Sequence, residues 1–201
     1  MMYLYGHPIS GHCHRVELLL SILGVAYEPV EVDLRAGAHK RPEFLAMNPF
    51  GQIPVLKDGE LVLADSNAIL VYLARRYDKS GQWLPDDPVG AARVQRWLSV
   101  AAGALAFGPA AARRICLFST SQDLPTAQTI ATGLLRLIDA TLASDPYLTG
   151  KTPTIADVAL YAYTARAPEG GVELAPYENV RAWLRRVEGL PGFVPMLSTL
   201  G

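Results

Sequence analysis

Hydrophobic positions in the first third of the chain alternate between short apolar runs and helical spacing. Residues 2–5 predict a buried strand, and residues 27–32 predict a second one. Between them, apolar side chains recur at i, i+3, i+4 and i+7, the spacing of a helix with one apolar face: Val16, Leu19, Leu20 and Leu23. Gly24 stands where a helix C-terminal cap belongs. A β-α-β opening favours a parallel strand pair with a right-handed crossover.

The pattern then changes to paired strands followed by a helix. Residues 54–56 and 61–63 are apolar runs that flank Asp58-Gly59, a strong signal for a β-hairpin. From Ser66 onward, apolar positions return to helical spacing. The resulting order of strands and helices is typical of a thioredoxin-like layer of sheet and helices, which we assign to residues 1–78.

Beyond residue 78 the pattern contains no strand signal. Residues 79–87 hold turn-forming residues without a period, and they predict a linker. Residues 93–105 and 127–142 have the spacing of long helices, and so do the apolar positions between residues 180 and 187. We therefore expect an all-α second domain over residues 88–201. The fold class predicted is an α/β domain followed by an all-α domain, with Trp97 and Phe107 in the helical core.

Composition excludes several classes of function. The formal net charge is -1, so no basic excess marks a nucleic-acid partner. The most apolar-rich stretch, residues 98–112, is too short to cross a bilayer, and the N-terminus lacks the pattern of a signal peptide. Two distant cysteines do not form a disulfide framework, which favours the reducing cytoplasm.

A metal site is not expected, although histidines and a cysteine gather near the N-terminus. His12, Cys13 and His14 are adjacent, and adjacent residues on a helix point in different directions. The chain contains no second cluster that would complete a four-ligand site.

Ser10 is the first candidate for chemistry. It lies between the first strand and the first helix, where unpaired backbone N–H groups and the helix dipole favour a negative charge. A serine hydroxyl at this point can donate a hydrogen bond to a bound thiolate. Taken alone, Ser10 is also a good ordinary N-cap.

Two further segments present backbone groups to a ligand. Ile53-Pro54 leads into a strand, and its X-Pro bond is a candidate cis peptide that would expose the main chain of Ile53 to a peptide-like ligand. An ordinary trans proline at a strand start is the alternative. Asp65-Ser66 opens a helix whose free amides, with the Ser66 hydroxyl, suit a carboxylate. Simple helix capping would account for the same two residues.

Together, and in this order, these three segments resemble the glutathione site of the cytosolic glutathione S-transferase family, in its serine-type, bacterial-like branch. The resemblance implies that Ser10 activates the glutathione sulfur, that Ile53 and the cis-proline Pro54 bind the cysteinyl unit, and that Asp65 and Ser66 hold the γ-glutamyl end. It also implies glycyl-carboxylate contacts from a further set: His39, Lys40 and Gln52. Without this resemblance, Lys40 would be interpreted as a solvated loop lysine.

The resemblance extends to the second domain, where Thr154-x-x-Asp157 is similar to the family's helix-capping motif. It also implies a homodimer, glutathione as co-substrate and a small hydrophobic electrophile as the second substrate. Tyr5 is the rival to Ser10, because other branches of the family use a tyrosine near the end of the first strand. Cys13, in the first helical turn, is either a reactive thiol or, more commonly, a packed and inert one.

The function implied is glutathione transfer, in which the glutathione thiolate attacks an electrophilic carbon. Three alternatives share the same site or fold. The first is a glutathione-dependent disulfide reductase or peroxidase, and the second a glutathione-dependent isomerase or dehalogenase. The third is a non-catalytic binding protein, since a fold does not fix a function.

Overall fold

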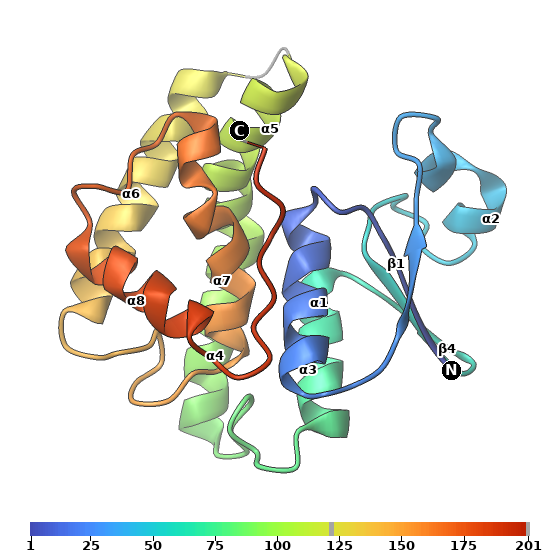
Figure 1. Cartoon of the computed structure of the whole chain (residues 1–201), viewed down its shortest axis with the longest axis horizontal. Helices are drawn as coiled ribbons and strands as arrows, with labels where there is room; N and C mark the ends of the chain where they lie inside the picture. The colour runs from blue at the N-terminus through green and yellow to red at the C-terminus, as the bar shows by residue number, and fades with distance from the viewer. Residues whose placement is uncertain (121–122, 200–201) are drawn as a thin grey trace.

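The computed structural model describes residues 1–120 and 123–199. The chain folds into two halves that pack side by side (Figure 1). The first half of the chain forms a small sheet with helices on both faces. Its elements are β1 (Met2–Gly6), α1 (Gly11–Ile22), β2 (Glu28–Glu31), a 3₁₀ turn η1 (Ala38–Lys40), α2 (Pro42–Leu45), β3 (Val55–Asp58), β4 (Leu61–Ala64) and α3 (Ser66–Tyr77).

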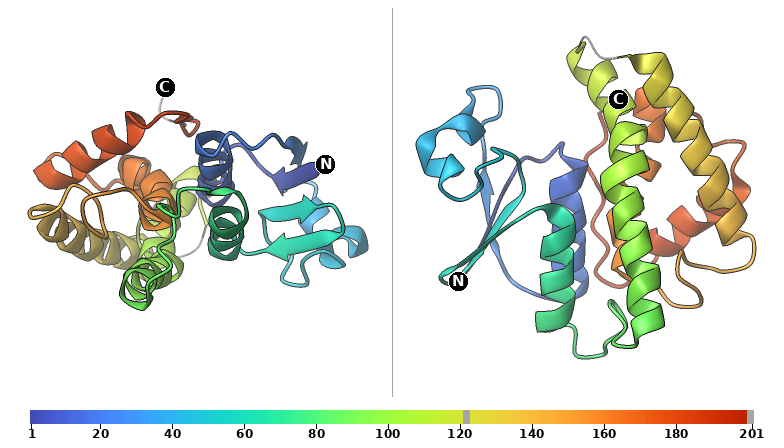
Figure 2. Two further views of the ribbon diagram at one scale, coloured as in Figure 1. Left: turned by 90° about the horizontal axis from the view of Figure 1, so that it is seen from below. Right: turned by 180° about the vertical axis from the view of Figure 1, so that it is seen from behind.

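The sheet has the order β2-β1-β3-β4. β1 and β2 run parallel, while β3 is antiparallel to both β1 and β4, so the predicted parallel pair and hairpin are both confirmed. Gly59 turns the hairpin with φ 59°, a backbone angle that glycine adopts without steric cost. α1 and α3 lie on the face of the sheet that meets the second half, and α2 lies on the other face (Figures 1 and 2).

The second half is helical. Its elements are α4 (Pro88–Val100), a π-helical turn η2 (Ala101–Leu105), α5 (Pro109–Phe118), α6 (Leu124–Leu142), α7 (Ile155–Ala165), a 3₁₀ turn η3 (Ala167–Gly170) and α8 (Glu178–Glu188). No sheet strand occurs among its described residues, which confirms the predicted fold class. α3 ends at Tyr77 and α4 begins at Pro88; the domain bounds drawn above stay a prediction.

α7 is the central helix of this half, and its N-terminus carries the predicted capping box. The Thr154 hydroxyl accepts a hydrogen bond from a first-turn amide, and the Asp157 carboxylate accepts one from the Thr154 backbone. Every residue of α7 from Ile155 to Thr164 is buried. One continuous apolar core joins α7 to α1, α3 and α4, so the two halves of the chain share a core.

Trp97 and Phe107 differ from each other in burial. Trp97 is buried and donates its indole N–H to the carbonyl oxygen of Leu148 at 2.9 Å, as expected of a core residue. Phe107 is 67% exposed, so the core assignment made for it above is wrong. Helical spacing itself accounts for this exposure, because Phe107 lies two positions, or about 200°, beyond the buried Leu105, on the opposite side of the helix.

The segment Pro88–Phe118 is, by length and composition only, long and apolar enough to cross a membrane. This segment is 31 residues long and is the one segment among the described residues that meets these criteria. Half of its most apolar window is buried inside the protein, and core helices of that kind meet the same criteria. The segment is therefore only a weak indication of a membrane span.

His14 on α1 makes the stability of the fold depend on pH. It is 3% exposed, and its Nε2 lies 2.9 Å from the carbonyl oxygen of Val194 in the C-terminal segment. Burial lowers its pKa from 6.5 to about 4. The unfolded chain therefore binds a proton below about pH 6.5 that the folded chain excludes until about pH 4, and stability is lost as the pH falls through this window.

We expect His14→Gln to reduce this loss, because a glutamine amide can donate to Val194 and does not titrate. Between pH 7 and pH 5 the wild type should lose about 2 kcal/mol more unfolding free energy than the variant, at 1.36 kcal/mol per pKa unit. Urea unfolding at the two pH values measures the difference. Equal losses of unfolding free energy in both proteins would mean that His14 takes up its proton over the same pH range in the folded and the unfolded chain.

Candidate active site

Ser10 lies at the N-cap of α1, as predicted. Its φ of -83° and ψ of 115° are extended, and its Oγ accepts a long hydrogen bond of 3.4 Å from the backbone N–H of Cys13. Because Oγ acts only as an acceptor there, the hydroxyl proton is available to a second partner. The first-turn amides and the positive end of the helix dipole lie at the same point, which favours an anion beside the hydroxyl.

The start of α1 is held against the helical half by a close contact at Gly11. A Cβ at this position would lie 2.8 Å from the Cζ atom of the Tyr163 ring on α7, closer than carbon atoms approach. The His12 ring meets the same tyrosine edge-on, with 5.0 Å between ring centroids. Gly11 therefore allows the helix that follows Ser10 to seat directly on α7.

The Ile53–Pro54 peptide bond is cis, as the sequence analysis suggested. Pro54 is buried and Ile53 half-buried, immediately before β3. Asn48 supports this loop, because its side-chain amide donates to the carbonyl oxygen of Gln52 at 2.7 Å and its oxygen accepts from the N–H of Phe50.

Asp65 and Ser66 stand at the start of α3. The Asp65 carboxylate accepts from the amides of Asn67 at 2.9 Å and Ala68 at 3.0 Å, so it caps the helix. Its φ of 71° lies in a region that non-glycine residues rarely adopt, at a cost of order 1 kcal/mol. Backbone strain of this kind is typical of binding sites.

Arg15 lies beneath this helix start, and the sequence analysis missed it. Its Nη1 donates to Ser66 Oγ at 3.2 Å and to Asn67 Oδ1 at 2.8 Å. The side chain is 1% exposed, and burial lowers its pKa to about 10, so it stays charged at neutral pH. The signal in the sequence was an arginine directly before the apolar face that begins at Val16.

His39, Lys40 and Gln52, assigned above to the glycyl end, lie around one loop. Lys40 Nζ donates to the carbonyl oxygens of Gly51 at 2.9 Å and Phe50 at 3.3 Å, which links η1 to the segment before β3. Gln52 is exposed and His39 half-buried. Gly51, with φ 58°, leaves room for the Lys40 side chain and the His39 carbonyl, which a Cβ would contact at 2.8 Å.

Tyr5 and Cys13, the other two candidates for chemistry, both have packing roles. Tyr5 lies against a separate apolar cluster around Val32, Phe44 and Val55, beneath α2. Strand alternation puts it on the face opposite to Leu4, away from α1. Cys13 is fully buried, and burial raises the pKa of its thiol to about 11, so it is not a thiolate at neutral pH. No metal-binding group occurs among residues 1–120 and 123–199.

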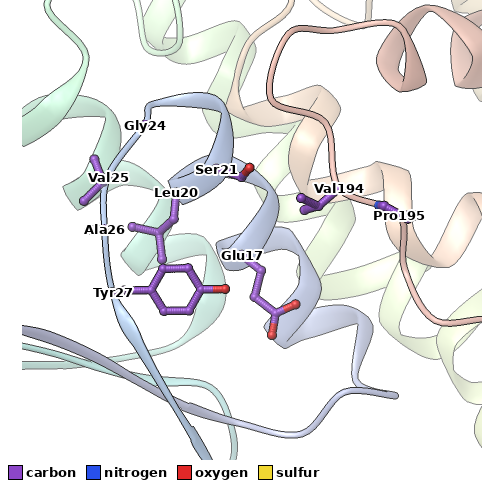
Figure 3. A pocket seen from close by; sticks show the side chains of 9 residues that line it. All are labelled: Glu17, Leu20, Ser21, Gly24, Val25, Ala26, Tyr27, Val194 and Pro195. Carbon is purple, nitrogen blue, oxygen red and sulfur yellow. The ribbon is translucent and has the colours of Figure 1, made fainter.

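A cavity of about 510 Å³ lies beside the C-terminal half of α1 (Figure 3). Its lining includes Glu17 and Ser21 of α1, Tyr27 after the helix, and Val194 and Pro195 of the C-terminal segment. None of the predicted site residues lines it. We therefore place the candidate site at the other end of α1, around Ser10.

The chain is similar to known proteins over both of its halves. The N-terminal domain model of glutathione S-transferases matches residues 1–75, and the C-terminal domain model matches residues 109–186. Glutathione S-transferase 3 of Zea mays is 38% identical over 98% of this chain and 93% of its own length. Glutathione S-transferase 2 of Anopheles gambiae is 31% identical over 96% of this chain and 93% of its own length.

Solved structures give the same result. The glutathione S-transferase of Pseudomonas fluorescens Pf-5 superposes with a TM-score of 0.92 at 36% identity, over 98% of this chain and 99% of that one. The predicted family, fold and enzyme class are confirmed, while the serine-type, bacterial-like branch stays a prediction. With both domain models matched and relatives aligned almost end to end, the chain belongs to the glutathione S-transferase family.

Proposed function

We propose that this transferase activates glutathione through a hydrogen bond from Ser10 to the sulfur. A free cysteine thiol has a pKa of about 8.5, so only a few per cent is ionised at neutral pH. A hydroxyl donor at a helix N-terminus stabilises the anion and lowers that pKa. The observation that carries the proposal is the N-cap geometry of Ser10, whose hydroxyl proton is not used by the helix.

The remaining site residues would hold glutathione along the edge of the first half. Ile53, before the cis-proline Pro54, offers main-chain groups to the cysteinyl unit. The start of α3, with Asp65 and Ser66, offers amides and a hydroxyl to the γ-glutamyl end. The glycyl carboxylate is assigned to the cationic loop of Lys40, with His39 and Gln52.

A small hydrophobic electrophile would meet the thiolate between Ser10 and the helical half. The thiolate attacks an electrophilic carbon, the bond to the leaving group breaks, and the leaving group departs with the electron pair. A homodimer, as the family resemblance implies, is part of the proposal. Location in the cytoplasm is part of the same proposal.

Thiolate absorbance in the ultraviolet tests the central step. The protein is titrated with glutathione from about pH 5 to pH 9, with S-methylglutathione as the blank. We expect bound thiolate with an apparent pKa clearly below about 8.5. Binding without such a shift, or no binding, would reject thiolate activation and favour a non-catalytic role.

Arg15 provides a separate test of the γ-glutamyl assignment. Arg15→Met should raise the KM for glutathione about tenfold with a smaller change in kcat, because Ser66 and Asn67 lose the donor that orients them. Two of its nitrogens, Nε and Nη2, have no hydrogen-bond partner in the described chain. No ion pair joins Arg15 to a described residue, so Arg15→Met leaves no carboxylate buried without its partner, and the variant should fold.

Steady-state kinetics with varied glutathione, together with urea unfolding, measures both effects. Arg75→Met is the control, since Arg75 lies at the far end of α3 from Ser66 and donates to the carbonyl oxygens of Leu84 and Pro85 and to the Asp86 carboxylate. A KM unchanged in Arg15→Met would remove Arg15 from the glutathione site.

A further inference from the structure

A buried arginine of the helical half reaches the loop that carries Ser10. Arg113 of α5 is 4% exposed, and its Nη1 donates to the carbonyl oxygen of Ile9 at 2.7 Å. Ile9 immediately precedes Ser10, whereas Arg113 lies 104 positions later in the chain. The contact therefore joins the second half of the protein to the residue next to the proposed thiolate donor.

The charge of Arg113 is balanced inside the helical half. Its Nε donates to Glu169 Oε2 at 2.6 Å, and this carboxylate on η3 is also buried. Thr199 donates its backbone N–H to Glu169 Oε1 at 3.2 Å and its hydroxyl to Glu169 Oε2 at 2.5 Å. Arg166 Nε lies 3.6 Å from Glu169 Oε1. The C-terminal segment, which contains Thr199, runs along α1 toward α5 (Figure 1). Paired in this way, Arg113 has a fixed position from which to bind Ile9.

The contact holds one edge of the Ile9–Ser10 peptide plane, and the other edge is held locally. The N–H of Ser10 donates to the carbonyl oxygen of His7 at 2.9 Å. A peptide unit is planar, so fixing its C=O and its N–H fixes its orientation. The carbonyl oxygen of Ser10 in turn accepts from the N–H of His14 at 2.9 Å, which holds the next peptide plane. The two planes together set φ of Ser10 and so the direction in which its Cα–Cβ bond leaves the backbone.

Catalytic hydrogen bonds depend on such orientation, because an error of about 1 Å in position can lower a rate about a hundredfold. The Ser10 side chain is held within the first turn of α1, by the long bond from the Cys13 N–H and a hydrogen bond with the Cys13 side chain. Its direction therefore depends mainly on its backbone, which Arg113 and His7 hold.

We propose that Arg113 is a positioning residue, which holds the Ile9–Ser10 peptide across the boundary between the two halves and so aims the Ser10 hydroxyl at the glutathione sulfur. The inference rests on the proposed role of Ser10. It adds that thiolate activation in the first half requires a contact from the second half.

Removal of Arg113 alone would leave Glu169 buried without its main partner, a change that often destabilises a fold severely. The test therefore uses the double variant Arg113→Met/Glu169→Gln, which removes both charges, beside Glu169→Gln, which keeps the arginine and its bond to Ile9. The thiolate pKa of bound glutathione and the kinetics with 1-chloro-2,4-dinitrobenzene are measured in both variants and in wild type. Urea unfolding confirms that each is folded.

In the double variant we expect the apparent pKa of bound glutathione to rise by about one unit, and kcat/KM at pH 6.5 to fall about tenfold with it. The KM for glutathione should change less than about twofold, because the binding groups lie elsewhere. Glu169→Gln should be less stable than wild type, because the buried arginine loses its counter-ion. Its thiolate pKa and kcat/KM should stay near the wild-type values, because the glutamine oxygen can still accept from Arg113 and the bond to Ile9 is kept. Arg113→Lys should recover part of the shift. A general structural disturbance would change KM as well and would not be rescued by lysine.

Two contrary results are distinguishable. A wild type without a lowered thiolate pKa overturns the role of Ser10 and, with it, that of Arg113. A wild type with a lowered pKa that the folded double variant retains overturns the role of Arg113 alone.

Discussion

Replacement of Ser10 by alanine should lower the conjugation rate at pH 6.5 by about 10- to 100-fold while glutathione still binds. The hydroxyl is the donor that we assign to the sulfur, and a shift of one to two pKa units corresponds to about 1.4–2.7 kcal/mol of preference for the anion. The apparent pKa of bound glutathione should rise toward about 8.5. Above pH 9 the variant and wild type should converge, because glutathione is then ionised without help.

The pH profile of kcat/KM and the thiolate absorbance of Ser10→Ala measure this effect. Loss of the N-cap itself should cost about 1 kcal/mol of stability, which urea unfolding detects separately. Ser10→Thr keeps both the cap and the hydroxyl and should restore most of the rate. Ser21→Ala, at the other end of α1, is the matched control. A rate in Ser10→Ala equal to wild type would exclude Ser10 and bring Tyr5 back as the donor.

Replacement of Asp157 by alanine should be the most destabilising single change that we predict, at about 3–5 kcal/mol. This carboxylate is fully buried. Its Oδ1 accepts from the N–H of Leu148 at 3.0 Å and the indole N–H of Trp183 at 2.9 Å, and its Oδ2 accepts from the N–H of Thr154 at 2.9 Å. Alanine would leave all three donors buried without a partner, at the junction of α7, α8 and the loop between α6 and α7.

Thermal unfolding should show a fall in Tm of about 10–15 °C for Asp157→Ala, at a few degrees per kcal/mol for a chain of this size. Asp145→Ala provides the control, since Asp145 lies in the loop between α6 and α7 and forms an exposed ion pair with Lys151. Such pairs contribute little, so its Tm should stay within about 2 °C of wild type. A fall of less than about 3 °C for Asp157→Ala would show that the carboxylate is not required to hold α7.

Signals that act between neighbours in the sequence predicted most of the fold. The hairpin at Asp58-Gly59, the N-cap at Ser10, the cis bond at Pro54 and the capping box at Thr154 each depend on residues within a few positions of each other. Helical spacing located α1, α3, α6 and α8, although α6 begins three residues earlier than predicted. α5 was not predicted, because Gly108-Pro109 resembles a turn and its small alanines give a weak apolar face.

The sequence by itself therefore determined the two-part architecture and the local form of each binding segment, since backbone conformation follows from nearby side chains. Only the tertiary structure decided what surrounds those segments. Arg15 contacts Ser66 from 51 positions away, and Arg113 contacts Ile9 from 104 positions away. Such contacts arise when helices pack, and packing depends on the combined shapes of several elements, which no periodic pattern within one element contains.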